Sequence, residues 1–251
     1  MTYRYVIRPP TILTTPRELS AVLGARGTRH ASRKKFQWSN EDGDFFLSYP
    51  DPSLVVDSVG GGSYSQVSAF YRKHKMGQRA SIIASGIRTP SSYASNRWVV
   101  RPLRHMGGRD FSLIESDEQP VVNTQTHYVS PFFDKKWEYR LVFVKGRHCL
   151  TLYKRVDPGT PSNVPWNHAC GSVFVTTDDW NACRLRHTTV LEDLGRCPII
   201  AAAHLVAVDV MLRKEPRGDW QYAVCEYNFA PALSIPENLE KVKEYAYSRP
   251  E

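Results

Sequence analysis

The chain has no long apolar segment and few cysteines. None of its apolar runs approaches the ~20 residues that a membrane-spanning helix needs. Residues 1–8 also lack the apolar core of a secretory signal. The five cysteines are odd in number, and no two of them form a C-x-x-C pair or a zinc-binding pattern. This usage predicts free thiols in a reducing compartment, so we expect a cytoplasmic protein.

The sequence also lacks internal repeats, low-complexity tracts and the Gly-Lys-Ser/Thr element of a P-loop. Its hydrophobic fraction of 41% and charged fraction of 23% are those of a globular protein and exclude a disordered chain. What it does have is positive charge, with 33 Lys and Arg against 25 Asp and Glu. A net charge of +8 favours anionic ligands such as nucleotide phosphates, nucleic acid or acidic substrates, and does not choose among them.

Hydrophobic periodicity predicts a strand-rich middle of the chain, flanked by helices. Helices are expected over 64–75, with a second helical run that reaches Gly86, over 189–203 with a break, and from the capping box at 234–237 onward. The basic stretch 26–43 is expected to be a loop. Strand character is found over 45–49, 97–102, 109–115, 126–133, 138–144 and 148–154. Mixed elements with mainly antiparallel pairing predict the α+β class.

Three oxygen-bearing side chains near the C-terminus form the most informative pattern. Asp209 ends one apolar run, and Glu226 and Asn228 end the next, with a polar turn over 214–219 between the runs. Two such runs predict an antiparallel hairpin in which Asp209 lies opposite Glu226 and Asn228. Two carboxylates and an amide oxygen on one sheet face are hard ligands suited to Mg²⁺. The alternative is a hairpin whose solvent-facing side simply carries polar residues.

A glycine pair in a basic segment is the second pattern. Residues 98–111 read as strand, loop and strand, with Gly107 and Gly108 surrounded by Arg101, Arg104 and other basic residues. Consecutive backbone N–H groups at glycines can cradle an anion. The segment can equally be a basic surface hairpin that contacts RNA.

Taken together, residues 70–235 resemble the ATP-grasp superfamily, especially its ribosomal-protein glutamate ligase and D-alanine–D-alanine ligase branches. The resemblance is carried by seven short motifs in the family's order. They begin with Lys75 before Gly86-Ile87 and with Val99-Val100-Arg101-Pro102, and they end with the metal hairpin. The resemblance implies two α+β lobes that clasp a nucleotide, residues 66–133 and 134–251. Residues 1–65 would form a small leading α/β domain.

The resemblance also implies roles for individual residues. The nucleotide would be bound by Lys75, Arg101, Arg104, Gly107, Gly108, the segment Tyr128-Val129-Ser130, Glu138 and Lys154. Arg140 and Arg155 would act on the transferred phosphate, and the metal ligands would be Asp209, Glu226 and Asn228. Arg101 stands where the family has lysine, and Ala232 stands where it usually has glycine. An arginine fork contacts phosphate with a geometry different from that of a lysine.

The implied activity is ATP-dependent carboxylate–amine ligation through an acyl phosphate, with ATP and Mg²⁺ or Mn²⁺ as cofactors. His127, His168 and His204 are candidate general bases by chemistry alone. The partners would be ATP with a carboxylate and an amine, and the acceptor can be an amino acid, a peptide, a protein or a nucleic acid. Two alternatives stay open: a nucleic-acid-binding or nucleic-acid-modifying protein that uses the basic stretch 26–35, and an ATP-grasp kinase.

Overall fold

The fold is seen in a computed structural model of the 251-residue chain. The structure describes residues 28–30, 35–38, 47–49, 75–103, 110–144, 146–166, 172–177, 179–202, 205–228 and 236–247. None of the helices in these ranges combines the length and the apolar character that crossing a bilayer requires.

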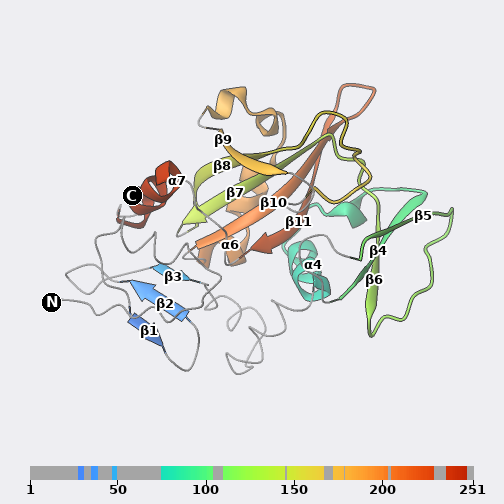
Figure 1. Ribbon diagram of the computed structural model, residues 1–251, viewed down its shortest axis with the longest axis horizontal. Coiled ribbons are helices and arrows are strands. Elements are labelled where there is room, and N and C mark those ends of the chain that lie inside the picture. Colours follow the sequence, from blue (N-terminus) through green and yellow to red (C-terminus); the bar gives the residue numbers. More distant parts are fainter. Residues whose placement is uncertain are drawn as a thin grey trace.

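A five-stranded antiparallel sheet forms the centre of the described molecule (Figure 1). Its strand order is β11-β10-β7-β8-β9. The bounds are β7 Trp137–Val144, β8 Arg147–Arg155, β9 Val173–Thr177, β10 Leu205–Lys214 and β11 Trp220–Asn228. The predicted hairpin is therefore formed by β10 and β11, and they pair antiparallel as expected. Strand β9 was missed, because its five residues lie between polar stretches with no clear turn signal.

A smaller antiparallel sheet has the order β5-β4-β6 and lies at one end of the larger one (Figure 1). Its bounds are β4 Arg97–Pro102, β5 Ser112–Glu115 and β6 His127–Pro131. A third sheet joins β1 Thr28–His30, β2 Lys35–Trp38 and β3 Leu47–Tyr49. The prediction of a loop over 26–43 is wrong at β1 and β2, because backbone pairing there outweighs the polar composition. The α+β class is confirmed.

Helices flank the sheets. The α-helices are α4 Lys75–Ala84, α5 Val190–Gly195, α6 Pro198–Ala202 and α7 Pro236–Tyr247. The described residues also include the 3-10 turns η1 Pro90–Ser92, η3 Trp180–Ala182 and η4 Arg184–His187. The break expected within 189–203 separates α5 from α6, where Gly195 and Pro198 stand. Gly77 does not interrupt α4, which runs through it.

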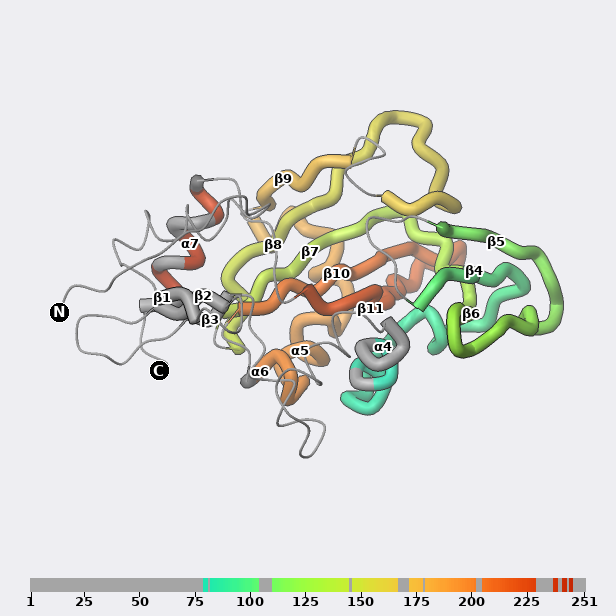
Figure 2. The backbone as a smooth tube through the Cα atoms, turned by 60° about the horizontal axis from the view of Figure 1, so that its bottom comes forward, coloured from blue at the N-terminus to red at the C-terminus, as the bar shows by residue number. Residues whose placement is uncertain are grey.

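The main core lies on one face of the larger sheet. Alternate residues of β10, which are Val206, Val208, Val210 and Leu212, are fully buried there. They pack with Leu141 and Phe143 of β7 and with side chains from α5 and α6. Figure 2 shows the backbones of these two helices beside the strands. Side chains of a strand alternate between its two faces, so the residues between these positions point to the opposite face.

Candidate active site

The face of the larger sheet opposite the main core carries charged side chains. Asp209 of β10 pairs with Arg140 of β7 on one side and with Glu226 of β11 on the other. Three ionisable residues therefore stand in one row across three adjacent strands. The next row on this face joins Val142, Ala207 and Asn228, which places Asn228 beside the charged row.

A β-bulge shapes this row. The register of β10 and β11 shifts between Asp209 and Val210, which pair with Glu226 and Val224, so Cys225 is the extra residue. Val224 and Tyr227 both lie in the main core although they are three positions apart. A bulge re-aims neighbouring side chains and is frequent beside active sites. Here it brings Glu226 opposite Asp209 while Tyr227 stays buried.

Arg140 and Asp209 form a bidentate ion pair. Arg140 Nε donates to Asp209 Oδ1 at 2.6 Å, and its second nitrogen, Nη2, donates to Oδ2 at 2.8 Å. The side chains are 10% and 6% exposed. Burial by itself lowers the pKa of Arg140, but the Asp209 carboxylate, helped by Glu226 and Glu138, raises it overall. The guanidinium therefore stays charged inside the protein.

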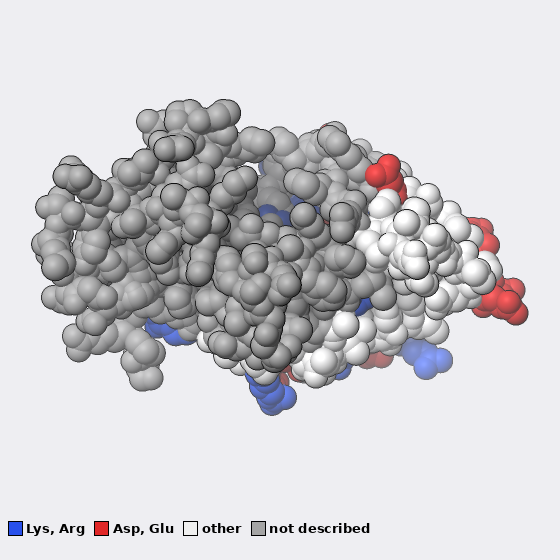
Figure 3. Space-filling view, turned by 90° about the horizontal axis from the view of Figure 1, so that it is seen from below, with Lys and Arg blue, Asp and Glu red and all other residues white. Residues whose placement is uncertain are grey.

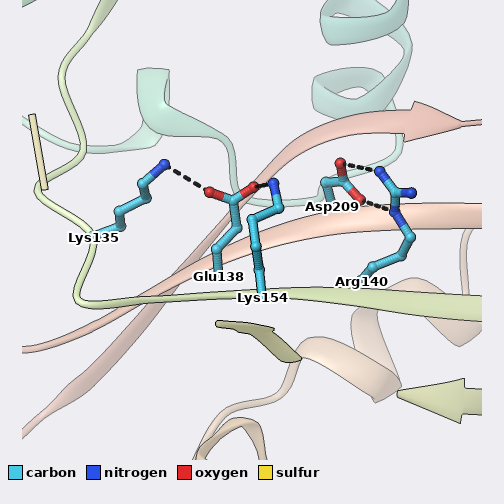
Figure 4. A network of polar contacts seen from close by, with 5 residues as sticks. All are labelled: Lys135, Glu138, Arg140, Lys154 and Asp209. Atoms are coloured by element: carbon cyan, nitrogen blue, oxygen red, sulfur yellow. Dashed lines mark hydrogen bonds and ion pairs between the residues drawn. The ribbon is translucent and has the colours of Figure 1, made fainter. Parts of the chain in front are cut away.

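A second buried network lies next to this pair. The Glu138 carboxylate accepts from Lys135 Nζ at 2.6 Å on one oxygen and from Lys154 Nζ on the other. Burial lowers the pKa of Lys154, and the Glu138 and Asp209 carboxylates more than offset this, so the pKa is raised. Figure 4 shows the side chains of Glu138, Arg140, Lys154 and Asp209 leaving their strands toward the same side, and Lys135 reaching Glu138 from the segment before β7.

Aromatic rings cover the cations of these networks. The Phe174 ring lies 4.3 Å from Arg140 Cζ and 5.2 Å from Lys154 Nζ, and the Trp166 ring lies 4.7 Å from Lys135 Nζ. A ring face attracts a cation and excludes water at the same time. The rings strengthen the electrostatic interactions of the site by lowering its water content.

Two further arginines face the hairpin from the smaller sheet and α4. Arg101 of β4 pairs with Tyr128 of β6, and Arg79 Cζ lies 5.3 Å from the Tyr128 ring centroid. Burial raises the pKa of Tyr128, Arg79 and Arg101 lower it, and Cys225 and Glu226 raise it. These groups are therefore close enough to interact. Nη1 of Arg79 and Nε and Nη2 of Arg101 are buried without a hydrogen-bond partner among the described residues.

The charge of this region is unbalanced. Among the described residues, five cations and three carboxylates lie there, an excess of two positive charges: Arg79, Arg101, Lys135, Arg140 and Lys154 against Glu138, Asp209 and Glu226. Figure 3 shows some Lys and Arg atoms near the middle of one face of the molecule. Positive charge that the described acidic groups do not balance fits an anionic ligand.

The residues at the hairpin fit a divalent cation. A carboxylate has about four lone-pair sites, and Arg140 uses one on each oxygen of Asp209, so Asp209 can also bind a metal. Glu226 stands opposite it, and Asn228 adds an amide oxygen. No cluster of three or more acidic, histidine or cysteine side chains that could hold a metal occurs in the part of the chain that the structure describes. At the hairpin, the described oxygen-bearing side chains are two carboxylates and one amide.

The structure brings together most of the predicted site residues that it describes. Glu138, Arg140, Lys154, Asp209 and Glu226 share one face, and Arg101 and Tyr128 stand beside Glu226. Val129 and Ser130 lie on β6, whereas Arg155 is exposed at the end of β8. The remaining predicted residues lie outside the described residues: the side chain of Lys75, which opens α4, and Arg104, Gly107, Gly108, His168 and His204.

Two residues of the site were missed from the sequence. Lys135 stands beside Lys136 in a pair that reads as solvent-exposed, yet Lys135 is buried against Glu138 and Trp166. Arg79 lies four residues after Lys75, so helical spacing places the two on one face of α4. That spacing was the signal available for Arg79.

No protein-family model and no curated protein matches the sequence. Solved structures do show a likeness. The chain is 12% identical to D-alanine–D-alanine ligase from Bacillus anthracis, solved with ATP, and 79% of this chain covers 74% of that one with a TM-score of 0.47. The chain is 10% identical to N5-carboxyaminoimidazole synthetase from Staphylococcus aureus, solved with ADP. That match covers 74% of this chain and 54% of the other, with a TM-score of 0.47.

A third structure is the ATP-grasp ligase PsnB, solved with a minimal precursor. It is 11% identical to this chain, with 76% of this chain and 66% of that one covered and a TM-score of 0.45. PsnB is an ATP-grasp ligase, and the motifs of this chain resemble that superfamily. All three TM-scores lie under 0.5.

Proposed function

We propose that this protein is an ATP-dependent ligase that joins a carboxylate to an amine through an acyl phosphate. The observation that carries the proposal is the pairing of two features across one site. One is the Asp209–Glu226–Asn228 set on the hairpin. The other is the buried nitrogens of Arg79 and Arg101, for which the described residues offer no acceptor. A triphosphate with a divalent cation fits both features: phosphate oxygens accept from the arginines, and the cation binds carboxylate and amide oxygens.

The proposed reaction has two steps. A carboxylate oxygen of the first substrate attacks the γ-phosphorus, the bond from this phosphorus to the β,γ-bridging oxygen breaks, and ADP leaves. The amine of the second substrate then attacks the acyl carbon, a carbon–nitrogen bond forms, and phosphate leaves with the electrons of the carbon–oxygen bond. The amine loses one proton. His127 Nδ1 is hydrogen-bonded to the hydroxyl of its neighbour Thr126. We assign no residue as the general base that takes this proton.

The chain's own residues position and neutralise charge in these steps. Arg101 would bind the phosphate chain, while Arg140 and Lys154 would face the transferred phosphate and Glu138 would accept from a ribose hydroxyl. A Mg²⁺ or Mn²⁺ ion held by Asp209, Glu226 and Asn228 would supply positive charge next to the phosphates. Preorganised charges in a site with little water are the largest source of rate in phosphoryl transfer. Arg155 is proposed for the same role from its motif alone.

The exposed position of Glu192 on α5 offers a control for the test of the metal site. Glu226→Ala should abolish Mg²⁺-dependent ADP release and leave the melting temperature nearly unchanged, because it removes one of two carboxylates that hold the cation. Glu192→Ala removes a carboxylate that is 59% exposed and should keep full turnover. Retained turnover in folded Glu226→Ala would remove this residue from the site.

ADP release, measured with a panel of amino acids and peptides, would identify the substrates. With an ¹⁸O-labelled carboxylate substrate, the acyl phosphate predicts transfer of one ¹⁸O atom to the released phosphate and an amide in the product. A stable phosphorylated product would instead identify the kinase alternative. Salt-sensitive binding of nucleic acid without any ATP turnover would favour a non-catalytic binding protein.

A further inference from the structure

An aromatic cluster lies at the end of the larger sheet where β7 begins and where β10 and β11 meet. Trp137 of β7 pairs in register with Leu212, and Trp220 of β11 pairs with Lys214. The centroids of the Trp137 and Trp220 rings lie 5.4 Å apart. Both rings are partly buried against the main core. They therefore lie on the face of the sheet opposite the charged row and the proposed nucleotide site.

His187 of η4 extends this cluster into solvent. Its ring is stacked on that of Trp220, with the centroids 5.2 Å apart and the planes 15° from parallel. Arg186 Nε donates to His187 Nε2 at 3.3 Å, which orients the ring. His187 is exposed. Because Trp220 covers one face of the imidazole, the other face is the one left to solvent, as a flat surface at the end of a stack.

Cations lie over the two tryptophan rings. Arg184 Cζ is 4.9 Å from the centroid of the Trp137 ring, and Lys214 Nζ is 5.5 Å from the centroid of the Trp220 ring. Both cationic side chains are exposed. Each ring attracts its cation and holds it near the stack without neutralising its charge.

The charge around the rings is positive. Arg186 of η4 and Arg217 of the turn between β10 and β11 are also exposed. The same turn carries Glu215, which is paired with Arg213 at 2.8 Å, and the exposed Asp219. Apart from the Arg213–Glu215 pair, four cations thus stand against one carboxylate among the described residues of η4 and the turn. The surface fits a partner with several negative charges.

The ring face and the cations together select the class of partner. A flat aromatic face binds a nucleobase by stacking, while cations beside it bind the flanking phosphates. An acidic peptide matches the charge but has no need of the ring face. A duplex keeps its bases stacked on one another, so an aromatic side chain takes up bases from single strands. Single-stranded nucleic acid matches both features.

We propose that the exposed face of His187 and the four cations around it form a docking surface for single-stranded nucleic acid. A base stacks on His187, and Arg184, Arg186, Lys214 and Arg217 bind phosphates. The surface places nucleic acid on residues 184–187 and 214–220 rather than on the basic stretch 26–35. It does not rest on the proposed ligase activity, because it lies on the other face of the sheet and needs no ATP.

Fluorescence anisotropy of a labelled oligothymidylate, measured with the full chain, tests the stacking. His187→Ala should weaken binding about tenfold, because one base–ring stack is lost while the cations remain. His127→Ala on β6 is the matched control and should bind as wild type does. The same strand in a duplex should bind more weakly. No binding by wild type at low salt, full affinity of folded His187→Ala, or equal binding of strand and duplex would each overturn the proposal.

The salt dependence of binding tests the cations. Replacement of Arg184 and Arg186 together by Gln should reduce the slope of log affinity against log salt by about 1.4, since each phosphate contact on a single strand contributes about 0.7. Arg196→Gln changes an arginine that is 71% exposed and should keep the full slope. If the double variant does not fold, Arg217→Gln in the exposed turn should reduce the slope by about 0.7. A full slope in these variants would place the phosphate contacts elsewhere and contradict the proposal.

Two competitors separate this surface from other anion sites. Poly-glutamate should displace the oligothymidylate weakly and to the same extent in wild type and His187→Ala, because it uses the cations alone. Saturating ADP should leave the affinity for the oligothymidylate unchanged. Displacement by ADP would place the strand in the nucleotide site, and poly-glutamate that binds as tightly as the strand would identify an acidic peptide as the partner. Either result would overturn the proposal, whatever the outcome of the ligase assays.

Discussion

The two faces of the five-stranded sheet are equally buried but chemically opposite. On β7, Leu141 and Phe143 are 0% and 2% exposed and face the main core, while Glu138 and Arg140 are 6% and 8% exposed and face the other way. One face is apolar at these positions, and the other carries paired charges among buried apolar residues such as Val142 and Ala207. The difference shows that burial alone does not identify a core, because a face of buried ions costs desolvation that packing would avoid.

The largest effect is expected from breaking the ion pair of the charged face. Asp209→Ala leaves the Arg140 guanidinium buried without its partner and should lower the free energy of unfolding by about 3–5 kcal/mol. The double variant Arg140→Met with Asp209→Leu removes both charges and should recover most of that stability, although neither variant should bind ADP. Urea denaturation gives the free energy of unfolding of the two variants, and calorimetry tests their binding of ADP. If the double variant is no more stable than Asp209→Ala, the cost does not come from the unpaired charge.

The apolar face should respond in the opposite way. Leu141→Ala creates a cavity at a fully buried position and should lower the free energy of unfolding by about 2–5 kcal/mol. Because this side chain does not face the charged row, the affinity for ADP should stay within about twofold of wild type. Urea denaturation and calorimetry on the same sample test the separation. Loss of affinity in a folded sample would show that the two faces are coupled.

The strands and their two faces could largely be predicted from the sequence. Alternation along β10 separates Val206, Val208 and Val210 from Asp209, and the two apolar runs predicted the hairpin. The bulge at Cys225 could not be predicted, because it depends on how β11 fits β10. The roles of Lys135 and Arg79 also escaped prediction, since each depends on a partner brought near by tertiary folding.

A titration at the apolar face gives a smaller and pH-dependent effect. His148 contacts the rings of Phe143 and Trp180, and burial lowers its pKa from 6.5 to about 4. The unfolded chain therefore binds this proton first, and stability should fall by up to about 3 kcal/mol as pH drops from about 6.5 to 4, with no further contribution below that.

The slope of stability against pH checks this assignment. His148→Gln should flatten the dependence between pH 6.5 and 4 in urea denaturation series, relative to wild type. Arg140 and Lys154 have raised pKa values and stay charged throughout that window, so these two groups add little slope. An unchanged slope in the variant would show that another group binds the proton.

The smallest effect is expected from an exposed ion pair. Arg196 and Glu192 pair on the surface at 71% and 59% exposure, one turn apart. Because solvent screens the two charges, such a pair contributes about 0.5 kcal/mol or less to the free energy of unfolding. Arg196→Ala should therefore change the free energy of unfolding by no more than this amount. Set beside Asp209→Ala, it measures how much burial amplifies an ion pair in this protein. A loss of 2 kcal/mol or more would contradict the comparison.

The most direct test of the charged face is a crystal structure with Mn²⁺ and a non-hydrolysable ATP analogue, using the anomalous signal of manganese. The account predicts a Mn²⁺ peak between the Asp209 and Glu226 carboxylates, with the phosphates of the analogue in contact with Arg79 and Arg101. A peak elsewhere, or an analogue bound away from both arginines, would contradict it.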